Sequence, residues 1–322
     1  MSITLRFPTF SSHLGVAVLG IAVALAVPAL AQAPAAPAAG GAAARRGGGG
    51  GGFTRATQQP WDDNTGFTQI FNGQNLDGWK GRTDVWSVKD GAIYAQTTPE
   101  NPTGTTNVWY TRGTYGNFIM KEEAKMVGNG NGGIQFRSAN VPPPAPPAPR
   151  ANRGARRGGA GRPGAFAGRR GPQLTPEQLA ARQQQMAALA VKNRDYYVRG
   201  YQLDMDTAGH YTGQLYEQGT GRGIIAFPGD VIVTEPGVPK VKVASLATPE
   251  ELKQWIPDPQ GWNDYEIIAE GHTLTQMVNG HVTSILVDVD PKFYAAKGIV
   301  GMEIEGNNMQ IWYKDIQIKP LP

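Results

Sequence analysis

The stretch "RGYQLDMD", residues 199–206, decides the fold class because its side chains alternate between apolar and polar. The two sets fall on opposite parities: Tyr201, Leu203 and Met205 against Gln202, Asp204 and Asp206. An alternation of period two is typical of a β-strand with one buried face. The other face of this strand therefore carries a row of amides and carboxylates.

Similar strand-like segments fill residues 61–140 and 195–322, among them "NFIMKEEAKMV" and "GGIQFRS". Asp90-Gly91 and Asn279-Gly280 predict tight hairpin turns between alternating runs. Short strands that do not alternate with amphipathic helices favour an antiparallel sandwich over a parallel α/β sheet. The sequence thus predicts an all-β fold.

Two low-complexity segments interrupt this pattern. Residues 32–60 are rich in Ala, Pro and Gly and are interpreted as a linker. Residues 141–194 form a basic insertion, which we expect to be disordered apart from one short helix over 175–193. Thr175 as N-cap and Pro176 at the first helical position predict where this helix begins. The insertion joins two strands of one domain, residues 61–322.

The net charge of +4 hides an acidic core. Residues 141–194 contain ten basic side chains and one acid, and residues 1–60 contain four basic side chains and no acid. The remainder carries −9, which argues against a nucleic-acid groove. The arginine-rich tract either contacts polyanions or is simply solvated.

The N-terminus predicts export. An apolar run over 14–27 is followed by "ALA" at 29–31, so residues 1–31 are interpreted as a cleaved signal peptide. The run is shorter than the roughly 20 residues that span a bilayer, although a retained anchor is the alternative. We expect a periplasmic or secreted protein that meets the membrane only through this signal; its oligomeric state is left open.

Several motifs in order, "FNGQNLDGW", "NGGIQFRS", "RGYQLDMD" and "GQLYEQGTGRGI", resemble the 3-keto-disaccharide hydrolase family. This family is also described as 3-keto-glucoside-1,2-lyase or 3-keto-2-hydroxy-glucal hydratase. The resemblance covers nearly all of residues 65–322 except the basic insertion. It implies a concanavalin A-like jelly roll of two curved antiparallel sheets, with a sugar site on the concave face.

The resemblance also implies an activity on an oligosaccharide or glycoside substrate oxidised at C3. A base removes the C2 proton, the C1 aglycone leaves by elimination, and water adds to the glucal. Such a site needs a base and a group that stabilises the enolate oxygen. The alternative is a lectin-like jelly roll that binds carbohydrate without catalysis.

The polar residues near the motifs supply the candidates. Asp204 and Glu217 are alternative bases, and Arg137 or Arg222 is expected at the oxyanion. No cofactor is indicated, but a divalent cation held by carboxylates is an open alternative to the arginine. We expect convergence of six side chains: Gln135, Arg137, Gln202, Asp204, Glu217 and Arg222. Further substrate contacts are expected from Tyr216, Trp109 and Glu305.

Each of these residues could instead have a purely structural role. A polar strand face is most often turned to water, and Arg137 could form a structural salt bridge with Glu122 or Glu217. Near the C-terminus, Glu303 and Glu305 stand where the family often has a glutamine and a histidine. Either Glu305 replaces that histidine or the step that needs it is lost.

The residues that three other kinds of active site require are missing from the sequence. The chain has no cysteine, and its few histidines lie on separate turns, which argues against a zinc site. There is no Gly-x-Ser-x-Gly elbow and no Glu-x-Asp-x-x-Glu strand, which argues against a serine esterase and against a laminarinase-type glycosidase.

Overall fold

The computed structural model describes residues 61–142, 175–238 and 240–322. The chain divides into the units Met1–Thr57 and Gln58–Pro322, and all described residues belong to the second. The predicted signal peptide (1–31), the linker (32–60) and residues 143–174 of the basic insertion lie outside the described residues. None of the described helices has the length and apolarity needed to cross a membrane.

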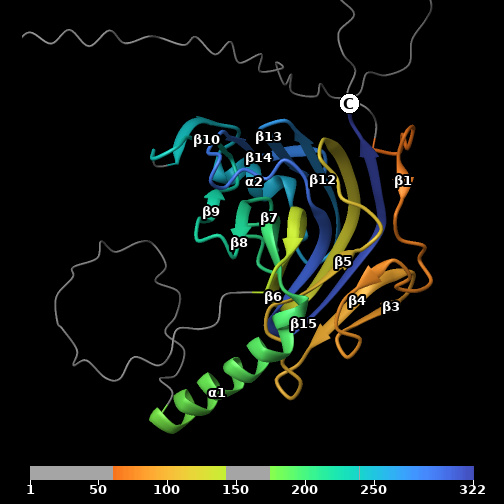
Figure 1. Ribbon diagram of the computed structural model, residues 1–322, viewed down its shortest axis with the longest axis vertical. Coiled ribbons are helices and arrows are strands. Elements are labelled where there is room, and N and C mark those ends of the chain that lie inside the picture. The colour runs from red at the N-terminus through yellow and green to blue at the C-terminus, as the bar shows by residue number, and fades with distance from the viewer. Residues whose placement is uncertain (1–60, 143–174, 239) are drawn as a thin grey trace, which may run out of the picture. The chain divides into compact units, whose positions relative to one another are not determined.

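The described residues are organised mainly as strands (Figure 1). Their bounds are β1 (Thr68–Gln69), β2 (Trp79–Lys80), β3 (Trp86–Lys89), β4 (Ala92–Thr97), β5 (Thr106–Tyr110), β6 (Phe118–Asn140), β7 (Val198–Asp206), β8 (Leu215–Gln218), β9 (Gly223–Ala226), β10 (Asp230–Thr234), β11 (Val241–Ser245), β12 (Trp262–Glu270), β13 (Thr273–Val278), β14 (His281–Asp288) and β15 (Ile299–Pro320). The helices are α1 (Pro176–Asn193), the 3₁₀ turn η1 (Arg194–Tyr196) and α2 (Pro249–Trp255).

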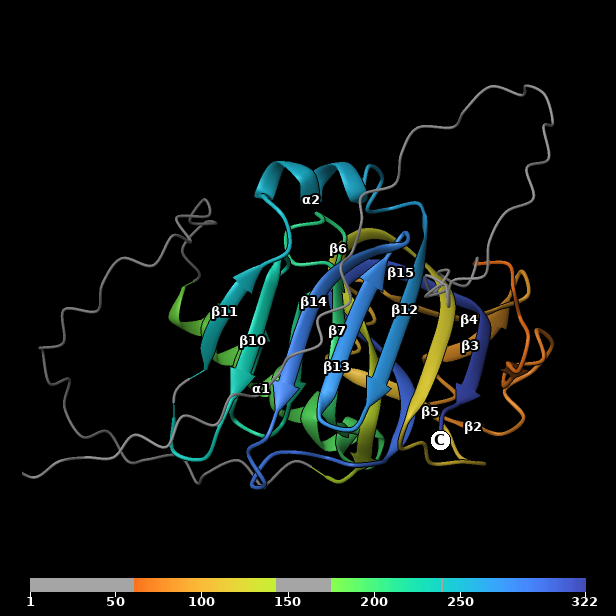
Figure 2. The ribbon, with the colours of Figure 1, turned by 90° about the horizontal axis from the view of Figure 1, so that it is seen from above.

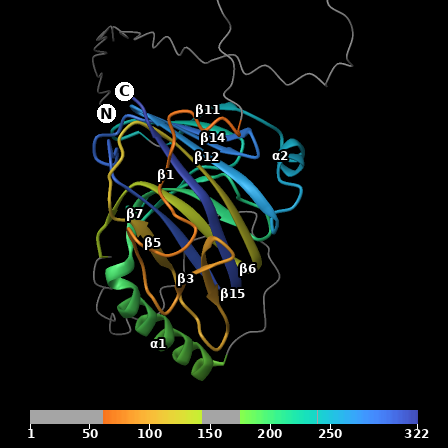
Figure 3. The same ribbon diagram turned by 90° about the vertical axis from the view of Figure 1, so that its right-hand side faces the viewer.

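Two long strands, β6 and β15, take part in both layers of a sandwich and pair with each other (Figure 3). Layer A has the order β11-β10-β14-β13-β12-β6-β15-β4-β3. Figure 2 shows β11, β10, β14, β13 and β12 of this layer side by side. Layer B continues from the other halves of the long strands, through β7, β8 and β9 on one side and β5 and β2 on the other.

This is the all-β jelly-roll sandwich that the sequence predicts. One detail differs from a purely antiparallel arrangement, because β10 and β14 are parallel. A second concerns "NFIMKEEAKMV" and "GGIQFRS", which belong to one continuous strand, β6. Glycines make this continuity possible: a Cβ at Gly130 would lie 2.6 Å from the Glu305 carbonyl oxygen on β15.

The core lies between the two layers, and the apolar side chains of β7 point into it. Tyr201 and Leu203 are fully buried there, with Ile134 and Phe136 from β6. The polar parity of β7 therefore points to the outer face of layer B. This division places Gln202 and Asp204 on the outer face and Tyr201 in the core.

The local predictions are confirmed where the structure describes them. Helix α1 begins at Pro176 with Thr175 as N-cap in a capping box with Gln178. The turn residues Asp90, Gly91, Asn279 and Gly280 all have positive φ, as the hairpin prediction requires. Sequence analysis missed α2, which likewise has a capping box, between Thr248 and Glu251.

Candidate functional site

The outer face of layer B brings two carboxylates together over a glycine. Asp204 on β7 and Glu303 on β15 are both cross-strand partners of Gly133 on β6. Because Gly133 has no side chain, nothing from the intervening strand separates the two acids. They face each other across one strand of the sheet.

The amide of Gln202 occupies the space above Gly133. Its Nε2 donates hydrogen bonds to Asp204 Oδ1 (2.5 Å) and to Glu303 Oε1 (3.2 Å). A Cβ at position 133 would lie 2.3 Å from that nitrogen. A glycine at 133 is thus what allows one amide to bridge both carboxylates.

Further amides fix this arrangement. Gln135 Nε2 donates to Gln202 Oε1 and also to Gln218 Oε1 (2.7 Å), which fixes the orientation of the bridging amide. Gln214 Nε2 donates to Asp204 Oδ2 (2.6 Å), and Asn107 Nδ2 donates to Glu303 Oε2 (3.4 Å). We call the set the amide–carboxylate cluster: Asn107, Gln135, Gln202, Asp204, Gln214, Gln218 and Glu303.

Asp204 and Glu303 are buried with no cationic side chain in the cluster, and burial raises the pKa of both. Asp204 is 7% exposed and Glu303 is 2% exposed. Burial raises the pKa of Asp204 to about 7, although the hydrogen bonds from Gln214 and Gln202 act in the opposite direction. Burial, followed by the negative charges of Glu305 and Asp204, raises the pKa of Glu303. The cluster therefore holds an exchangeable proton near neutral pH.

Three of the six side chains expected to converge do so: Gln135, Gln202 and Asp204. Tyr216 and Glu305, expected as substrate contacts, lie at the edge of the cluster. Tyr216 is the cross-strand partner of Gln202 and is half-buried, whereas Glu305 is exposed and acts electrostatically on Asp204 and Glu303. Both have surface that a ligand can reach.

The convergence expected for Glu217 and Arg222 is wrong. Glu217 pairs with Tyr201, so it points into the space between the layers, whereas its neighbours Tyr216 and Gln218 point outward. Arg222 Nε contacts Glu217 Oε2 at 2.6 Å, and its Nη2 contacts Asp288 Oδ2 at 2.7 Å. All three side chains are at most 8% exposed.

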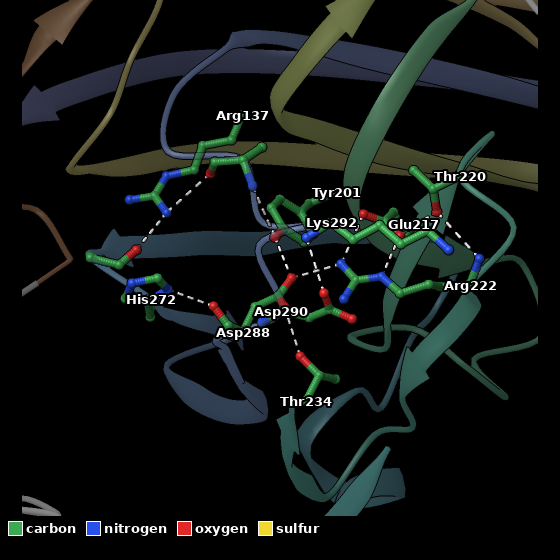
Figure 4. A network of polar contacts seen from close by, with 12 residues as sticks. Arg137, Tyr201, Glu217, Thr220, Arg222, Thr234, His272, Asp288, Asp290 and Lys292 are labelled. Atoms are coloured by element: carbon green, nitrogen blue, oxygen red, sulfur yellow. Dashed lines mark hydrogen bonds and ion pairs between the residues drawn. The ribbon is translucent and has the colours of Figure 1, made fainter. Parts of the chain in front are cut away.

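Figure 4 shows these interactions as one interlayer ion network. Besides Arg222, Asp288 accepts hydrogen bonds from the Tyr201 hydroxyl (2.5 Å) and from Thr234 Oγ1 (2.7 Å). Burial acts to raise the pKa of Asp288, but these hydrogen bonds and the Arg222 charge lower it below its usual range. Both carboxylates of this network are paired with Arg222 through its Nε and Nη2, while its Nη1 has no hydrogen-bond partner. A network of this kind is suited to holding the layers together.

Arg137 also departs from its expected place. The pairing of β6 with β7 shifts between Phe136 and Ala139, and Arg137 has a φ of 43°. This irregularity breaks the parity that would have put Arg137 beside Gln135. Its guanidinium donates to carbonyl oxygens of Gly116 (2.8 Å) and Gly271 (2.7 Å). The salt bridge considered with Glu122 or Glu217 does not form.

Trp109 cannot offer an open ring for a sugar. It lies on the same face as the cluster but is only 5% exposed, and its ring packs 6.4 Å from that of Tyr196. The cluster also contains residues that sequence analysis did not assign to the site: Asn107, Gln214, Gln218 and Glu303. For Glu303 a signal existed, since it alternates with buried Met302 and Ile304.

A cation in place of the arginine finds no support in the donor set. Among the described residues, no group of three or more His, Asp or Glu side chains could hold a metal ion. One oxygen of each carboxylate, Asp204 Oδ1 and Glu303 Oε1, already accepts a hydrogen bond from Gln202 Nε2. The described residues therefore do not fit a cation site.

The described residues thus define a jelly-roll sandwich with two buried acids, Asp204 and Glu303, on the outer face of one layer. More particularly, the sequence matches the 3-keto-alpha-glucoside-1,2-lyase-like domain over residues 66–168 and 177–319. The chain belongs to this family, and its function is carbohydrate-related. No curated protein matches the sequence.

Several solved structures resemble the chain distantly. One is a protein of unknown function with a galectin-like fold from Bacillus subtilis (TM-score 0.44, 13% identity, 79% of this chain and 94% of that chain). Another is the carbohydrate-binding module CBM66 from Bacillus subtilis (TM-score 0.40, 11% identity, 76% and 98%). A third is the β-glucanase of Bacillus licheniformis (TM-score 0.38, 11% identity, 80% and 97%).

Proposed function

We propose that this protein is an enzyme that cleaves 3-keto-glycosides, with Asp204 as the base and Glu303 as the acid. The observation that carries the proposal is the pair of buried carboxylates bridged by Gln202, which share a raised affinity for protons. A carboxylate whose pKa lies near the working pH is effective in general acid–base catalysis. Membership of the 3-keto-alpha-glucoside-1,2-lyase-like family supports this choice of substrate.

The first half-reaction is an elimination. The C3 ketone acidifies the C2 hydrogen, and ionised Asp204 accepts this proton. Electrons move through the enolate to form the C1–C2 double bond as the C1–oxygen bond breaks. Protonated Glu303 donates its proton to the departing aglycone oxygen. Asp204 is then protonated and Glu303 is ionised.

The second half-reaction restores both acids. Glu303 accepts a proton from water while the water oxygen bonds to C1, and Asp204 returns its proton to C2. The product is the free 3-keto sugar. Because each acid ends in its starting state, the two steps form a closed cycle that consumes one water.

The decisive experiment supplies purified protein with a 3-keto-glucoside and, separately, with the parent glucoside that is not oxidised. Mass spectrometry follows the glucal and the free aglycone. We expect release from the keto substrate alone, with Asp204→Asn inactive and Asp264→Asn, on the other layer, fully active. An unchanged rate with EDTA is expected, since the donor set does not fit a cation. Equal turnover by Asp204→Asn would refute the assignment.

The lectin-like alternative makes a different prediction for the same sample. A binding module would retain the keto sugar in equilibrium dialysis without forming glucal. The burial of Trp109 counts against this alternative, because it removes the aromatic platform expected on this face. We further propose, from residues 1–31, that the protein is exported to the periplasm or beyond; detection in a periplasmic or culture-fluid fraction tests this.

A further inference from the structure

Enolate chemistry at the amide–carboxylate cluster needs a hydrogen-bond donor for the negative charge that develops on the C3 oxygen. Arg137 and Arg222, the two arginines expected in this role, lie elsewhere, and the described residues do not fit a cation site. The amide nitrogens of Gln135 and Gln202 each already donate two hydrogen bonds within the cluster. Half-buried hydroxyl groups beside the cluster are donors that a ligand can reach.

A second row of residues runs beside the row that contains the two buried acids. Two positions before Gly133 on β6, Asn131 is the cross-strand partner of both Asp206 and Glu305. The two rows are therefore parallel, and the rise of the strand separates them by roughly 7 Å. Asn131 Nδ2 donates a hydrogen bond to the Tyr211 hydroxyl (3.4 Å). This bond places the phenol beside the second row.

The loop that carries Tyr211 is fixed to β7, the strand of Asp204. The carboxylate of Asp206, at the end of β7, is 4% exposed and accepts three hydrogen bonds from this loop. The donors are the backbone N–H groups of His210 (3.2 Å) and Tyr211 (3.0 Å) and the Thr212 hydroxyl (3.2 Å). A loop folded around a buried carboxylate holds its phenol in a defined position relative to Asp204.

The Tyr211 hydroxyl has a proton available for a ligand. Burial raises the pKa of this hydroxyl, the hydrogen bond from Asn131 lowers it, and the negative charges of three acids raise it again, namely Asp206, Asp204 and Glu305. Because the oxygen accepts from Asn131, the hydrogen is free to point toward another group. Tyr211 is half-buried, so a ligand can reach it. A neutral phenol of this kind is suited to donating to an oxyanion.

Two other tyrosines flank the cluster but are held less firmly. Burial, followed by negative charges that include Glu303 and Glu305, raises the pKa of both Tyr197 and Tyr216. Within the described part of the chain, neither of these two hydroxyls takes part in a hydrogen bond. Tyr211 differs because an amide of the sheet fixes its hydroxyl. Preorganisation of this kind is what makes a donor effective in catalysis.

The separation of the two rows suits a 3-keto sugar. A base takes the C2 proton across a heavy-atom distance of about 3 Å, and a hydroxyl contacts an oxygen at about 2.5–3.0 Å. The bonded unit of C2, C3 and the C3 oxygen lies between these two contacts. Together they span the roughly 7 Å between the rows. Asp204 can thus reach C2 while Tyr211 reaches the oxygen on C3.

We propose that the Tyr211 hydroxyl stabilises the enolate oxygen of the bound 3-keto sugar, an inference that rests on the cleavage function proposed above. As Asp204 accepts the C2 proton, the C2–H electron pair forms a C2–C3 double bond and the carbonyl electrons move to the C3 oxygen. Tyr211 donates a hydrogen bond to this oxygen and keeps its proton. When the aglycone leaves, the C1–C2 double bond forms and the C3 carbonyl is restored.

The test separates enolate formation from elimination. In 3-keto-1,5-anhydroglucitol, C1 carries no leaving group, so in D₂O the enzyme can only exchange the C2 hydrogen for deuterium, which NMR measures. Tyr211→Phe should lower this exchange rate at saturating ligand about 100-fold, because the lost hydrogen bond forms with the enolate. Its KM should change less than about threefold. The matched control is Tyr94→Phe, which removes a hydroxyl from a half-buried tyrosine on layer A and should exchange at the wild-type rate.

The possible outcomes separate this role from the cleavage proposal. If Tyr211→Phe exchanges at the wild-type rate while Asp204→Asn is inactive, the role of Tyr211 is overturned and the cleavage proposal stands. A large loss in Tyr216→Phe instead of Tyr211→Phe also overturns it. A loss in Tyr211→Phe together with a lowered melting temperature would show a structural role. If the wild type neither exchanges the C2 hydrogen nor cleaves a 3-keto-glucoside, the proposed function fails and this role fails with it.

Discussion

Asp204 and Asp288 are buried aspartates in the same sandwich, yet their environments have opposite effects on their protons. Asp204 is surrounded by neutral amides and by other acids, so burial prevails and raises its pKa to about 7. Asp288 is paired with Arg222, and its pKa is lowered despite burial. The charge of the partner, rather than burial alone, decides which acid can exchange protons near neutrality.

The largest effect should come from removing the exchanging acid. We expect Asp204→Asn to lower kcat for a 3-keto-glucoside by about two to four orders of magnitude, because the general base is lost. Gln214 Oε1 has no hydrogen-bond partner, so its amide can flip to accept from the new asparagine. The variant should therefore fold, and circular dichroism checks this. A residual rate above a tenth of wild type would contradict the assignment.

Removing the cation of the interlayer ion network should instead affect stability. Arg222→Ala leaves Glu217 and Asp288 buried without their counter-ion, which should cost about 3–5 kcal/mol in the free energy of unfolding. Urea denaturation measures this. The matched control is Arg112→Ala, since the Arg112–Asp77 pair is more than half exposed and should contribute at most about 1 kcal/mol. Equal losses in both variants would invalidate the comparison.

The pH dependence of stability should distinguish the two acids. For Asp204 the folded pKa is raised, so its contribution to stability is fully present below the unfolded value of 3.8 and is lost as the pH rises through about 7. For Asp288 the folded pKa is lowered, so its contribution is lost as the pH falls below 3.8.

Thermal melts from pH 4 to pH 8 test the contribution of Asp204, and melts below pH 4 test that of Asp288. In wild type the free energy of unfolding should decline between pH 4 and pH 7. Asp204→Asn should reduce this decline by roughly 2–4 kcal/mol. The control Asp90→Asn, at an exposed hairpin turn, should follow the wild-type curve. An Asp204→Asn curve parallel to wild type would show that Asp204 titrates normally.

The smallest of these changes tests the glycine beneath the bridging amide. Gly133→Ala places a Cβ against Gln202 Nε2 and should destabilise the fold by about 1–3 kcal/mol. The substitution should also move the carboxylates of Asp204 and Glu303 apart. The pH dependence of the cleavage rate should then show one titrating group instead of two. Gly116→Ala, whose Cβ would meet only ordinary contacts, is the control and should stay within about 0.5 kcal/mol.

The sequence by itself determined the strands, two hairpin turns, helix α1 and the all-β class, because these depend on local periodicity and turn chemistry. Parity along "RGYQLDMD" was enough to put Gln202 and Asp204 on one face. The motif order was enough to identify the family. These features depend on interactions between residues that are close in the sequence.

Only the tertiary structure decided which acids belong together. Glu303 lies about a hundred positions from Asp204 in the chain, and register across Gly133 brings them face to face. Glu217 and Arg222 look equally catalytic in the sequence, but pairing with Tyr201 turns Glu217 inward to Arg222 and Asp288. A backbone irregularity at Arg137 removes it from its expected face. Register, bulges and long-range partners arise from packing between distant segments, which local periodicity does not encode.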